Sequence, residues 1–242
     1  MENNKIHEIE ENFNKKLGEY NGVVLFIGHG SKNQYKKEEK GPLDILLKKI
    51  DKVVEEFNKT YNNNWIAVYG GDKNQGEHHP DIGYIMYYLK HHHRIPIAAI
   101  IMKDNSTIEI KDAFWLDLIF YTEFNKDING QILYGGLYQN QLVGATKVYL
   151  GDQWTDPSLS SSILKNKNKK RLLDHVMAIG GGNISFQEIK YAFEKGISIT
   201  YLPAEIHHQI HHEPDPLCKK YGPIHQWALE HKEDITILSL DE

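Results

Sequence analysis

The stretch Ile179-Gly180-Gly181-Gly182-Asn183-Ile184-Ser185-Phe186-Gln187-Glu188 decides the fold that this sequence predicts. An apolar run, residues 176–179, leads into it, and apolar residues recur after it at the helical spacing of Ile189, Ala192 and Phe193. This order predicts a strand, a glycine turn and a helix. Glycines allow a ligand to approach the backbone closely, and the N–H groups at the start of a helix attract an anion. The residues predicted to bind phosphate here are Gly181, Gly182, Asn183 and Ser185.

Two more apolar runs end in glycines. Residues 23–27 lead into Gly28-His29-Gly30-Ser31, and residues 65–69 lead into Gly70-Gly71-Asp72. In an open α/β sheet, ligands bind outside the carboxyl ends of the strands, so we expect these turns to share one crevice. The further residues predicted to bind the ligand or its phosphate in this crevice are Gly28, His29, Gly30, Ser31, Gly70 and Gly71.

The rest of the chain has the spacing of alternating strands and helices. Near-continuous apolar runs predict strands at residues 23–27, 65–69, 97–101, 146–150, 176–179 and 197–202. Helical stripes of apolar residues predict helices over residues 43–57, 80–90 and 185–195. This alternation favours a parallel sheet with right-handed crossovers. We therefore predict a Rossmann-like α/β fold, a doubly wound and mostly parallel sheet in a single domain, residues 1–242.

Two segments do not follow this alternation. Residues 104–143 are predicted to be an insertion, in which residues 114–124 fit either a helix or a strand. Residues 205–242 are predicted to be a C-terminal extension, and its last apolar run, residues 235–240, predicts an edge strand.

The composition limits the classes of function. The chain has 242 residues, of which 40% are hydrophobic, enough for one sizeable core. A formal charge of −5 gives no support for a nucleic-acid surface. Cys218 is the only cysteine, and no apolar run approaches membrane-spanning length. We therefore expect a cytoplasmic protein that binds neither nucleic acid nor membrane.

Glu188 and Asp72 are the candidate catalytic residues, and each has a structural alternative. Residues 185–188 also spell a capping box, in which the serine and the glutamate satisfy the donors of the helix start. At the floor of a phosphate crevice, the same glutamate could instead act as a general base toward water or bind a ribose hydroxyl. Asp72 fits either a turn aspartate that bonds its own backbone or a second carboxylate in the crevice.

A histidine tract offers a metal alternative. Residues 206–212 set histidines at i and i+4, a spacing that can chelate zinc on a helix. The tract lacks the glutamate of a zinc protease, and Pro214 and Pro216 would break a continuing helix. We predict no metal site and no cofactor.

The three glycine turns resemble those of the SLOG superfamily of Rossmann-like domains, which includes the LOG or lysine decarboxylase-like phosphoribohydrolases. Residues 28–31 occupy the place of the family's first glycine-serine turn, and residues 69–71 look like its Tyr-Gly-Gly. Residues 181–188 are similar to its motif Gly-Gly-x-Gly-Thr-x-x-Glu, with Ser185 in place of threonine and Ile184 in place of the later glycine.

The resemblance implies a crevice for a ribose-phosphate ligand and leaves two functions open. One is an N-glycoside hydrolase that acts on a nucleotide or an NAD-like molecule, with Glu188 assisting water. The other is a non-catalytic sensor of a nucleotide such as ADP-ribose or a cyclic derivative. The family's enzymes carry an Arg–Lys pair where this chain has Lys165-Asn166, which favours the sensor, whereas a domain without an attached effector favours the enzyme. We expect a nucleotide-type small molecule as the ligand and a homo-oligomer, a dimer or larger.

Overall fold

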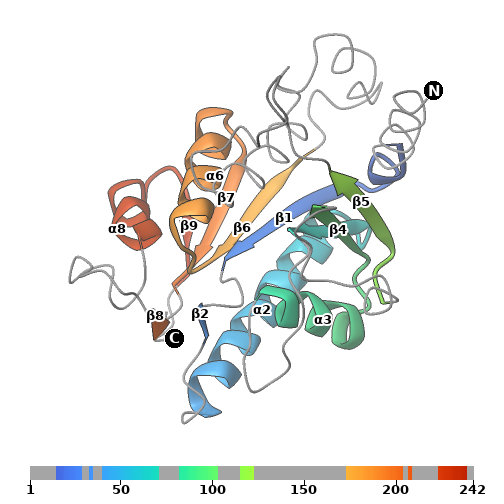
Figure 1. Cartoon of the computed structure of the whole chain (residues 1–242), viewed down its shortest axis with the longest axis horizontal. Helices are drawn as coiled ribbons and strands as arrows, with labels where there is room; N and C mark the ends of the chain where they lie inside the picture. Colours follow the sequence, from blue (N-terminus) through green and yellow to red (C-terminus); the bar gives the residue numbers. More distant parts are fainter. Residues whose placement is uncertain are drawn as a thin grey trace, which may run out of the picture.

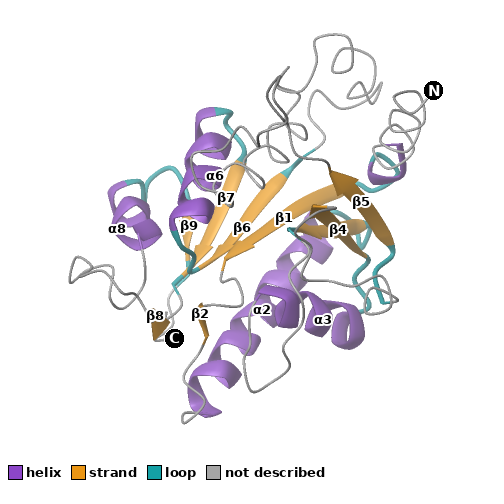
Figure 2. Ribbon diagram, viewed as in Figure 1, coloured by secondary structure: helices purple, strands orange, loops and turns teal. Residues whose placement is uncertain are grey.

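Seven strands form one parallel sheet, with helices on both of its faces (Figures 1 and 2). The computed structural model describes residues 15–28, 33–34, 40–70, 82–102, 115–122, 173–203, 207–208 and 223–238. The strands of the sheet are β1 (Gly22–Gly28), β3 (Trp65–Tyr69), β4 (Ile97–Met102), β5 (Leu118–Thr122), β6 (His175–Ile179), β7 (Ser198–Leu202) and β9 (Thr236–Ile237). The helices are α2 (Lys40–Thr60), α3 (Ile82–His93), α6 (Asn183–Glu194) and α8 (Pro223–Glu230). The Rossmann-like α/β prediction is confirmed.

Most of the predicted strands are confirmed to within one residue at each end. The runs at 23–27, 65–69, 97–101, 176–179 and 197–202 correspond to β1, β3, β4, β6 and β7. The strand predicted at residues 146–150 lies outside the described residues. Residues 114–124, left open between helix and strand, contain β5, which pairs in parallel with β4. Part of the segment treated as an insertion is therefore the edge strand of the main sheet, and β9 forms the opposite edge as expected.

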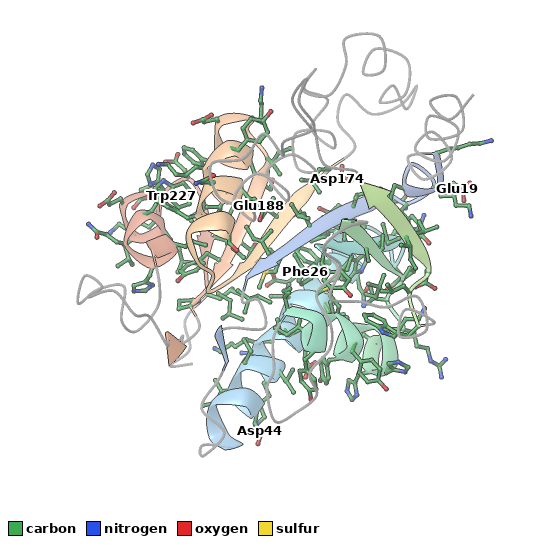
Figure 3. All side chains as sticks on the ribbon, in the orientation of Figure 1. Glu19, Phe26, Asp44, Asp174, Glu188 and Trp227 are labelled. Atoms are coloured by element: carbon green, nitrogen blue, oxygen red, sulfur yellow. The ribbon has the colours of Figure 1, made fainter. Side chains whose placement is uncertain are left out.

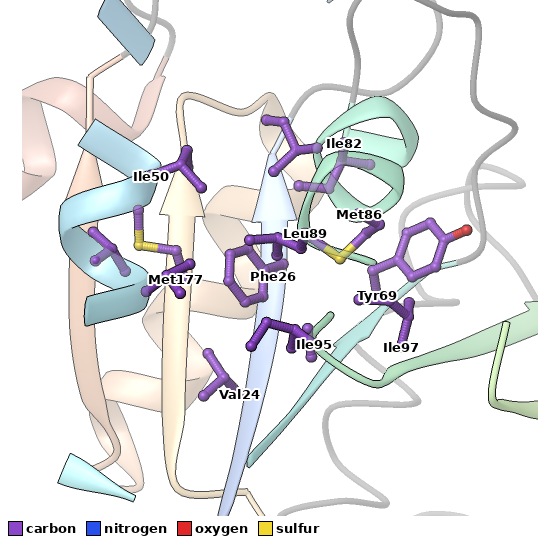
Figure 4. Packing of buried hydrophobic residues seen from close by; sticks show 14 of the residues in the cluster. Val24, Phe26, Ile50, Tyr69, Ile82, Met86, Leu89, Ile95, Ile97 and Met177 are labelled. Carbon is purple, nitrogen blue, oxygen red and sulfur yellow. The ribbon is translucent and has the colours of Figure 1, made fainter. Parts of the chain in front are cut away.

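The two faces of the sheet have separate hydrophobic cores because strand side chains alternate between them. On the face covered by α2 and α3, Val24 and Phe26 of β1 pack with Ile50, Met86 and their neighbours (Figure 4). On the other face, the core is shared by the strands, α6 and α8. The residues of this second core include Leu25, Ile27, Val176, Ala178, Ile189, Ala192, Ile224 and Trp227. Helices on both faces explain why the strands read as continuous apolar runs.

The order of the strands reverses between β1 and β6. The chain runs outward from β1 through β3 and β4 to β5, and then returns to place β6 on the other side of β1. From β6 it runs outward in the opposite direction through β7 to β9. In open α/β sheets this reversal is the topological switch point, where ligands bind at the carboxyl ends of the strands.

Two aspartates fix the register of neighbouring strands at the amino ends of the strands. The Val23 N–H donates to Oδ2 of Asp174 at 2.8 Å, and the Asp174 N–H donates to the Val23 carbonyl oxygen at 3.0 Å. The same pair of bonds joins Ile97 and Asp117, at 2.8 and 2.9 Å. Each aspartate directly precedes a strand, so it aligns that strand with its neighbour before the sheet begins.

Helix α6 ends in a glycine-stabilised Schellman motif. The Gly196 N–H donates to the Phe193 carbonyl oxygen at 2.9 Å, and the Ile197 N–H donates to the Ala192 carbonyl oxygen at 3.0 Å. Gly196 has a φ of 64°, a conformation that glycine adopts without steric cost. The end predicted for this helix, residue 195, lies within one residue of the observed end at Glu194.

His175 begins β6 in an apolar environment. Its Nε2 lies 2.9 Å from Oγ1 of Thr200, and its ring packs edge-on against Phe57 at 4.9 Å between centroids. Burial lowers the pKa of His175 from 6.5 to about 4. The imidazole is therefore neutral in the folded protein at neutral pH.

We expect His175 to make the folded protein less stable in mild acid. Below pH 6.5 the unfolded chain binds a proton at this position that the folded chain excludes until about pH 4. The free energy of unfolding is therefore unaffected by this histidine above pH 6.5. It falls by up to about 3 kcal/mol as the pH is lowered from 6.5 to about 4. Urea unfolding at a series of pH values measures this loss. His175→Gln should flatten the profile in that interval.

Candidate functional site

The switch point is built on a close approach between the ends of β1 and β6. Gly28, the last residue of β1, pairs with Ile179, the last residue of β6. A Cβ at Gly28 would lie 2.5 Å from the carbonyl oxygen of Ile179, closer than real side chains come to backbone. The strand ends that precede the two predicted glycine turns therefore lie side by side, and glycine is required at this end of β1.

The turn after β6 has a backbone that favours glycine. Gly180 has a φ of 54° and Gly181 a φ of 118°. The Gly180 N–H donates to the Leu202 carbonyl oxygen at 2.9 Å, which ties the turn to the end of β7. Gly182 is the N-cap of α6 and contributes no side-chain hydrogen bond. Because the first N–H groups of a helix have no intrahelical acceptor, this turn is suited to an anion.

Ser185 connects α6 to the end of β1 and does not cap the helix. The N-cap is Gly182, so Ser185 is already the third residue of α6. Its Oγ donates to the Gly28 carbonyl oxygen at 3.2 Å, and its side chain is buried. The capping-box interpretation of Ser185 and Glu188 is therefore wrong, because the glycine turn places the N-cap three residues earlier than the serine signal indicated.

Glu188 lies on the side of α6 that faces the sheet. Figure 3 places its side chain between α6 and β6. The side chain is 1% exposed, and the neighbouring Ile189 and Ala192 belong to the core. Glu188 and Ser185 are three residues apart, so they share this helix face. The structure thus places a buried carboxylate one turn behind the serine that contacts β1.

Several other predicted site residues can be placed only in part. Gly70 directly follows β3, the strand next to β1, so the second glycine turn starts one strand away from the first. Asn183 is the first residue of α6, where an N–H group faces the turn. The predicted residues outside the described part of the chain are His29, Gly30, Ser31, Gly71 and Asp72.

Helix α8 packs against the site, which was not predicted from the sequence. A Cβ at Gly181 would lie 2.9 Å from Cδ1 of Ile224, so the start of α8 packs directly against the glycine turn. The Tyr201 hydroxyl lies 3.5 Å from Nδ1 of His225, and burial lowers the pKa of that histidine. The signal was the helical spacing of Ile224, Trp227 and Ala228 within the predicted extension.

The histidine tract starts in a strand, not in a helix. His207–His208 form β8, which pairs antiparallel with β2 (Asn33–Gln34). Helical i, i+4 chelation therefore does not apply to the first two histidines. The pairing brings the tract beside the segment that follows the first glycine turn, although the two are far apart in sequence. Within the described ranges, no three His, Cys, Asp or Glu residues are grouped so that they could hold a metal ion.

The fold and its glycine turns define a Rossmann-like α/β protein. No protein-family model matches the chain, and no curated protein matches it. Among solved structures, the chain is similar to the X-ray structure of TM1055, a target of the Northeast Structural Genomics Consortium, with a TM-score of 0.42. The identity is 11%, and the match covers 91% of this chain and 95% of that chain. None of the helices described here is long and apolar enough to cross a membrane.

Gly181→Ala should disrupt the turn more than the same substitution at Gly196. Both glycines have a positive φ, so alanine is strained at each, by about 1 kcal/mol. Only at Gly181 would the new Cβ also overlap neighbours, with Cβ of Ser185 at 2.8 Å and Cδ1 of Ile224 at 2.9 Å. Overpacking of this kind adds roughly 1–3 kcal/mol. Urea unfolding of the two variants measures the difference, and equal losses would contradict the close packing around Gly181.

Proposed function

We propose that this protein binds a nucleotide at the switch point between β1 and β6 and hydrolyses its N-glycosidic bond. The observation that carries the proposal is the junction of Gly28 with the glycine start of α6, behind which Glu188 is buried. The chemistry would be that of a phosphoribohydrolase or an NAD-like nucleotide glycohydrolase, consistent with the resemblance of residues 181–188 to the SLOG motif.

The glycine turns support binding of the phosphate. Gly180 to Gly182 carry no side chains that would keep a ligand from the backbone, and they lead into the positive end of the α6 dipole. Gly28 ends the neighbouring strand in direct contact with β6. A phosphate could therefore be held between two adjacent turns by backbone N–H groups.

In the proposed reaction, a water molecule attacks the anomeric carbon of the ribose. The C–N glycosidic bond breaks, and the base leaves with the bonding electron pair. A base without a charge on its glycosidic nitrogen also takes up a proton, whereas the cationic base of an NAD-like molecule leaves neutral without one. Glu188 would accept the proton of the attacking water, and Asp72 would supply a second carboxylate to orient the ribose or the water. The step needs water alone as its co-reactant, in agreement with a prediction of no cofactor.

A non-catalytic nucleotide sensor is the second candidate. It is favoured by the burial of Glu188, which is 1% exposed and thus out of contact with bulk water in this conformation. Lys165-Asn166, at the place of the Arg–Lys pair of the related enzymes, supports the same alternative. Such a sensor would hold ADP-ribose or a cyclic derivative intact and signal through a change in conformation or assembly. A homo-oligomer and a cytoplasmic location remain predictions for either function.

Mass spectrometry of the ligands released from freshly purified protein tests the proposal directly. The protein is then incubated with a panel of nucleoside monophosphates, NAD, ADP-ribose and cyclic derivatives. Free base that accumulates with time would support the hydrolase, and an intact nucleotide that remains bound would support the sensor. A protein that neither binds nor cleaves any member of the panel would contradict both.

Glu188→Gln separates the functional role of Glu188 from a structural one. The substitution keeps the shape and polarity of the side chain and removes the proton acceptor. We expect turnover to fall by roughly 100-fold or more while the thermal stability changes little. The matched control is Glu194→Gln, the same chemical change at an exposed position of the same helix.

If the protein is a sensor, Glu188→Gln should weaken nucleotide binding, and neither the wild-type protein nor the variant should show turnover. Isothermal titration calorimetry beside the turnover assay distinguishes the two results. Unchanged binding and unchanged turnover in Glu188→Gln would remove the central carboxylate from the proposed site.

Metal removal should not change nucleotide binding. The proposed phosphate contacts come from backbone N–H groups, which need no metal. We expect the dissociation constant to be the same before and after dialysis against a chelator, and the same in His207→Ala. Because β8 lies beside the segment after the first glycine turn, the variant is a stringent test. Stoichiometric zinc retained through dialysis, with lost binding in His207→Ala, would contradict the prediction.

A further inference from the structure

Ser185 makes the hydrogen bond that joins the two proposed phosphate turns. Its Oγ donates to the carbonyl oxygen of Gly28 at 3.2 Å, between residues 157 positions apart in the chain. The Ser185 side chain is 5% exposed. The bond therefore links the end of β1 to the first turn of α6 within the interior of the protein.

Ser185 packs against Gly181 and is hydrogen-bonded to the end of β1. A Cβ at Gly181 would lie 2.8 Å from Cβ of Ser185 and 3.1 Å from its Oγ. On the other side, Gly28 itself is held against the Ile179 carbonyl oxygen, where a Cβ would lie at 2.5 Å. Ser185 thus fills the gap between Gly181 and Gly28, and a shift of either turn would break its hydrogen bond or its packing.

The chemistry of a hydroxyl limits what Ser185 can do for a phosphate. A serine hydroxyl has one hydrogen to donate, and a phosphate oxygen accepts hydrogen bonds. In this structure that hydrogen is used by the Gly28 carbonyl oxygen. While the bond is in place, Ser185 has no donor for the phosphate.

We propose that Ser185 is a positioning residue, which fixes the Gly181–Gly182 turn and the start of α6 against the end of β1 at Gly28, so that the N–H groups of this helix start are held in place for one phosphate. This role rests on the proposed nucleotide site. It replaces direct phosphate binding, the role that the sequence predicted for Ser185, and it accounts for the burial of a polar side chain at a glycine turn.

Three variants test the role. Ser185→Ala removes the hydrogen bond, and Ser185→Thr keeps a hydroxyl at the same position. Thr200→Val is the matched control, because it removes another partly buried hydroxyl bond of the same sheet, to His175, away from the switch point. Unfolding in urea calibrates the loss of stability in each variant.

Hydrogen exchange and ligand binding give two separate readouts. In the ligand-free protein, Ser185→Ala should speed amide exchange in the peptide that contains Gly28, with β3 unchanged. Its affinity for ADP-ribose and for inorganic pyrophosphate should fall about tenfold, the effect of losing one ordering hydrogen bond. Thr200→Val should change neither readout, and Ser185→Thr should restore both toward the wild-type values.

The two readouts distinguish failure of this role from failure of the proposed function. Weaker binding with unchanged exchange at Gly28 would overturn the positioning role in favour of direct contact between Ser185 and phosphate. Unchanged exchange and unchanged binding in Ser185→Ala would overturn the positioning role outright. Equal effects of Ser185→Ala and Thr200→Val would also overturn it. If the wild-type protein binds neither ADP-ribose nor pyrophosphate, the proposed function is overturned. The positioning role toward phosphate is then overturned too, whatever the rate of amide exchange at Gly28.

Discussion

The close contact between Gly28 and Ile179 is the constraint on which the arrangement of this protein depends. It allows β1 and β6 to stay paired to their last residues, so the two strands end at the same level of the sheet. Any side chain at Gly28 would push the Ile179 carbonyl oxygen away and separate the strands where the strand order reverses. The glycine turn, the start of α6 and the bond from Ser185 all follow from this contact.

Different residues stabilise the amino ends and the carboxyl ends of the parallel strands. At the amino ends, the side chains of Asp174 and Asp117 align neighbouring strands, and His175 is buried as a neutral imidazole. These groups contribute to stability. At the carboxyl ends of the strands, Gly28 and Gly181 have no side chains, which costs conformational entropy on folding but allows the close packing of β1, β6 and α6. The side-chain hydrogen bonds that align the strands thus lie at the amino ends, and the proposed binding site lies at the carboxyl ends.

The sequence predicted the strands well because burial on both faces produces continuous apolar runs, as in residues 65–69. It left residues 114–124 undecided because an aromatic run fits either period. It misread Ser185 because a capping signal is local, whereas the Gly28 carbonyl oxygen that the hydroxyl contacts lies 157 residues away. The contact of Ile224 with Gly181 is equally non-local, so the spacing within α8 indicates a helix but not its neighbour.

The distance from the turn to Glu188 bears on how the proposed site would work. Glu188 is five residues beyond Asn183, a rise of about 7.5 Å along the helix. A phosphate at the helix start would therefore not meet the carboxylate directly, which limits repulsion between two negative groups. Helical side chains point back toward the N-terminus, so the carboxylate extends from its own turn toward the phosphate. Ser185 lies one turn nearer to the helix start on the same buried face, so a ribose with its phosphate on the turn could bring its anomeric carbon to Glu188 only past this serine.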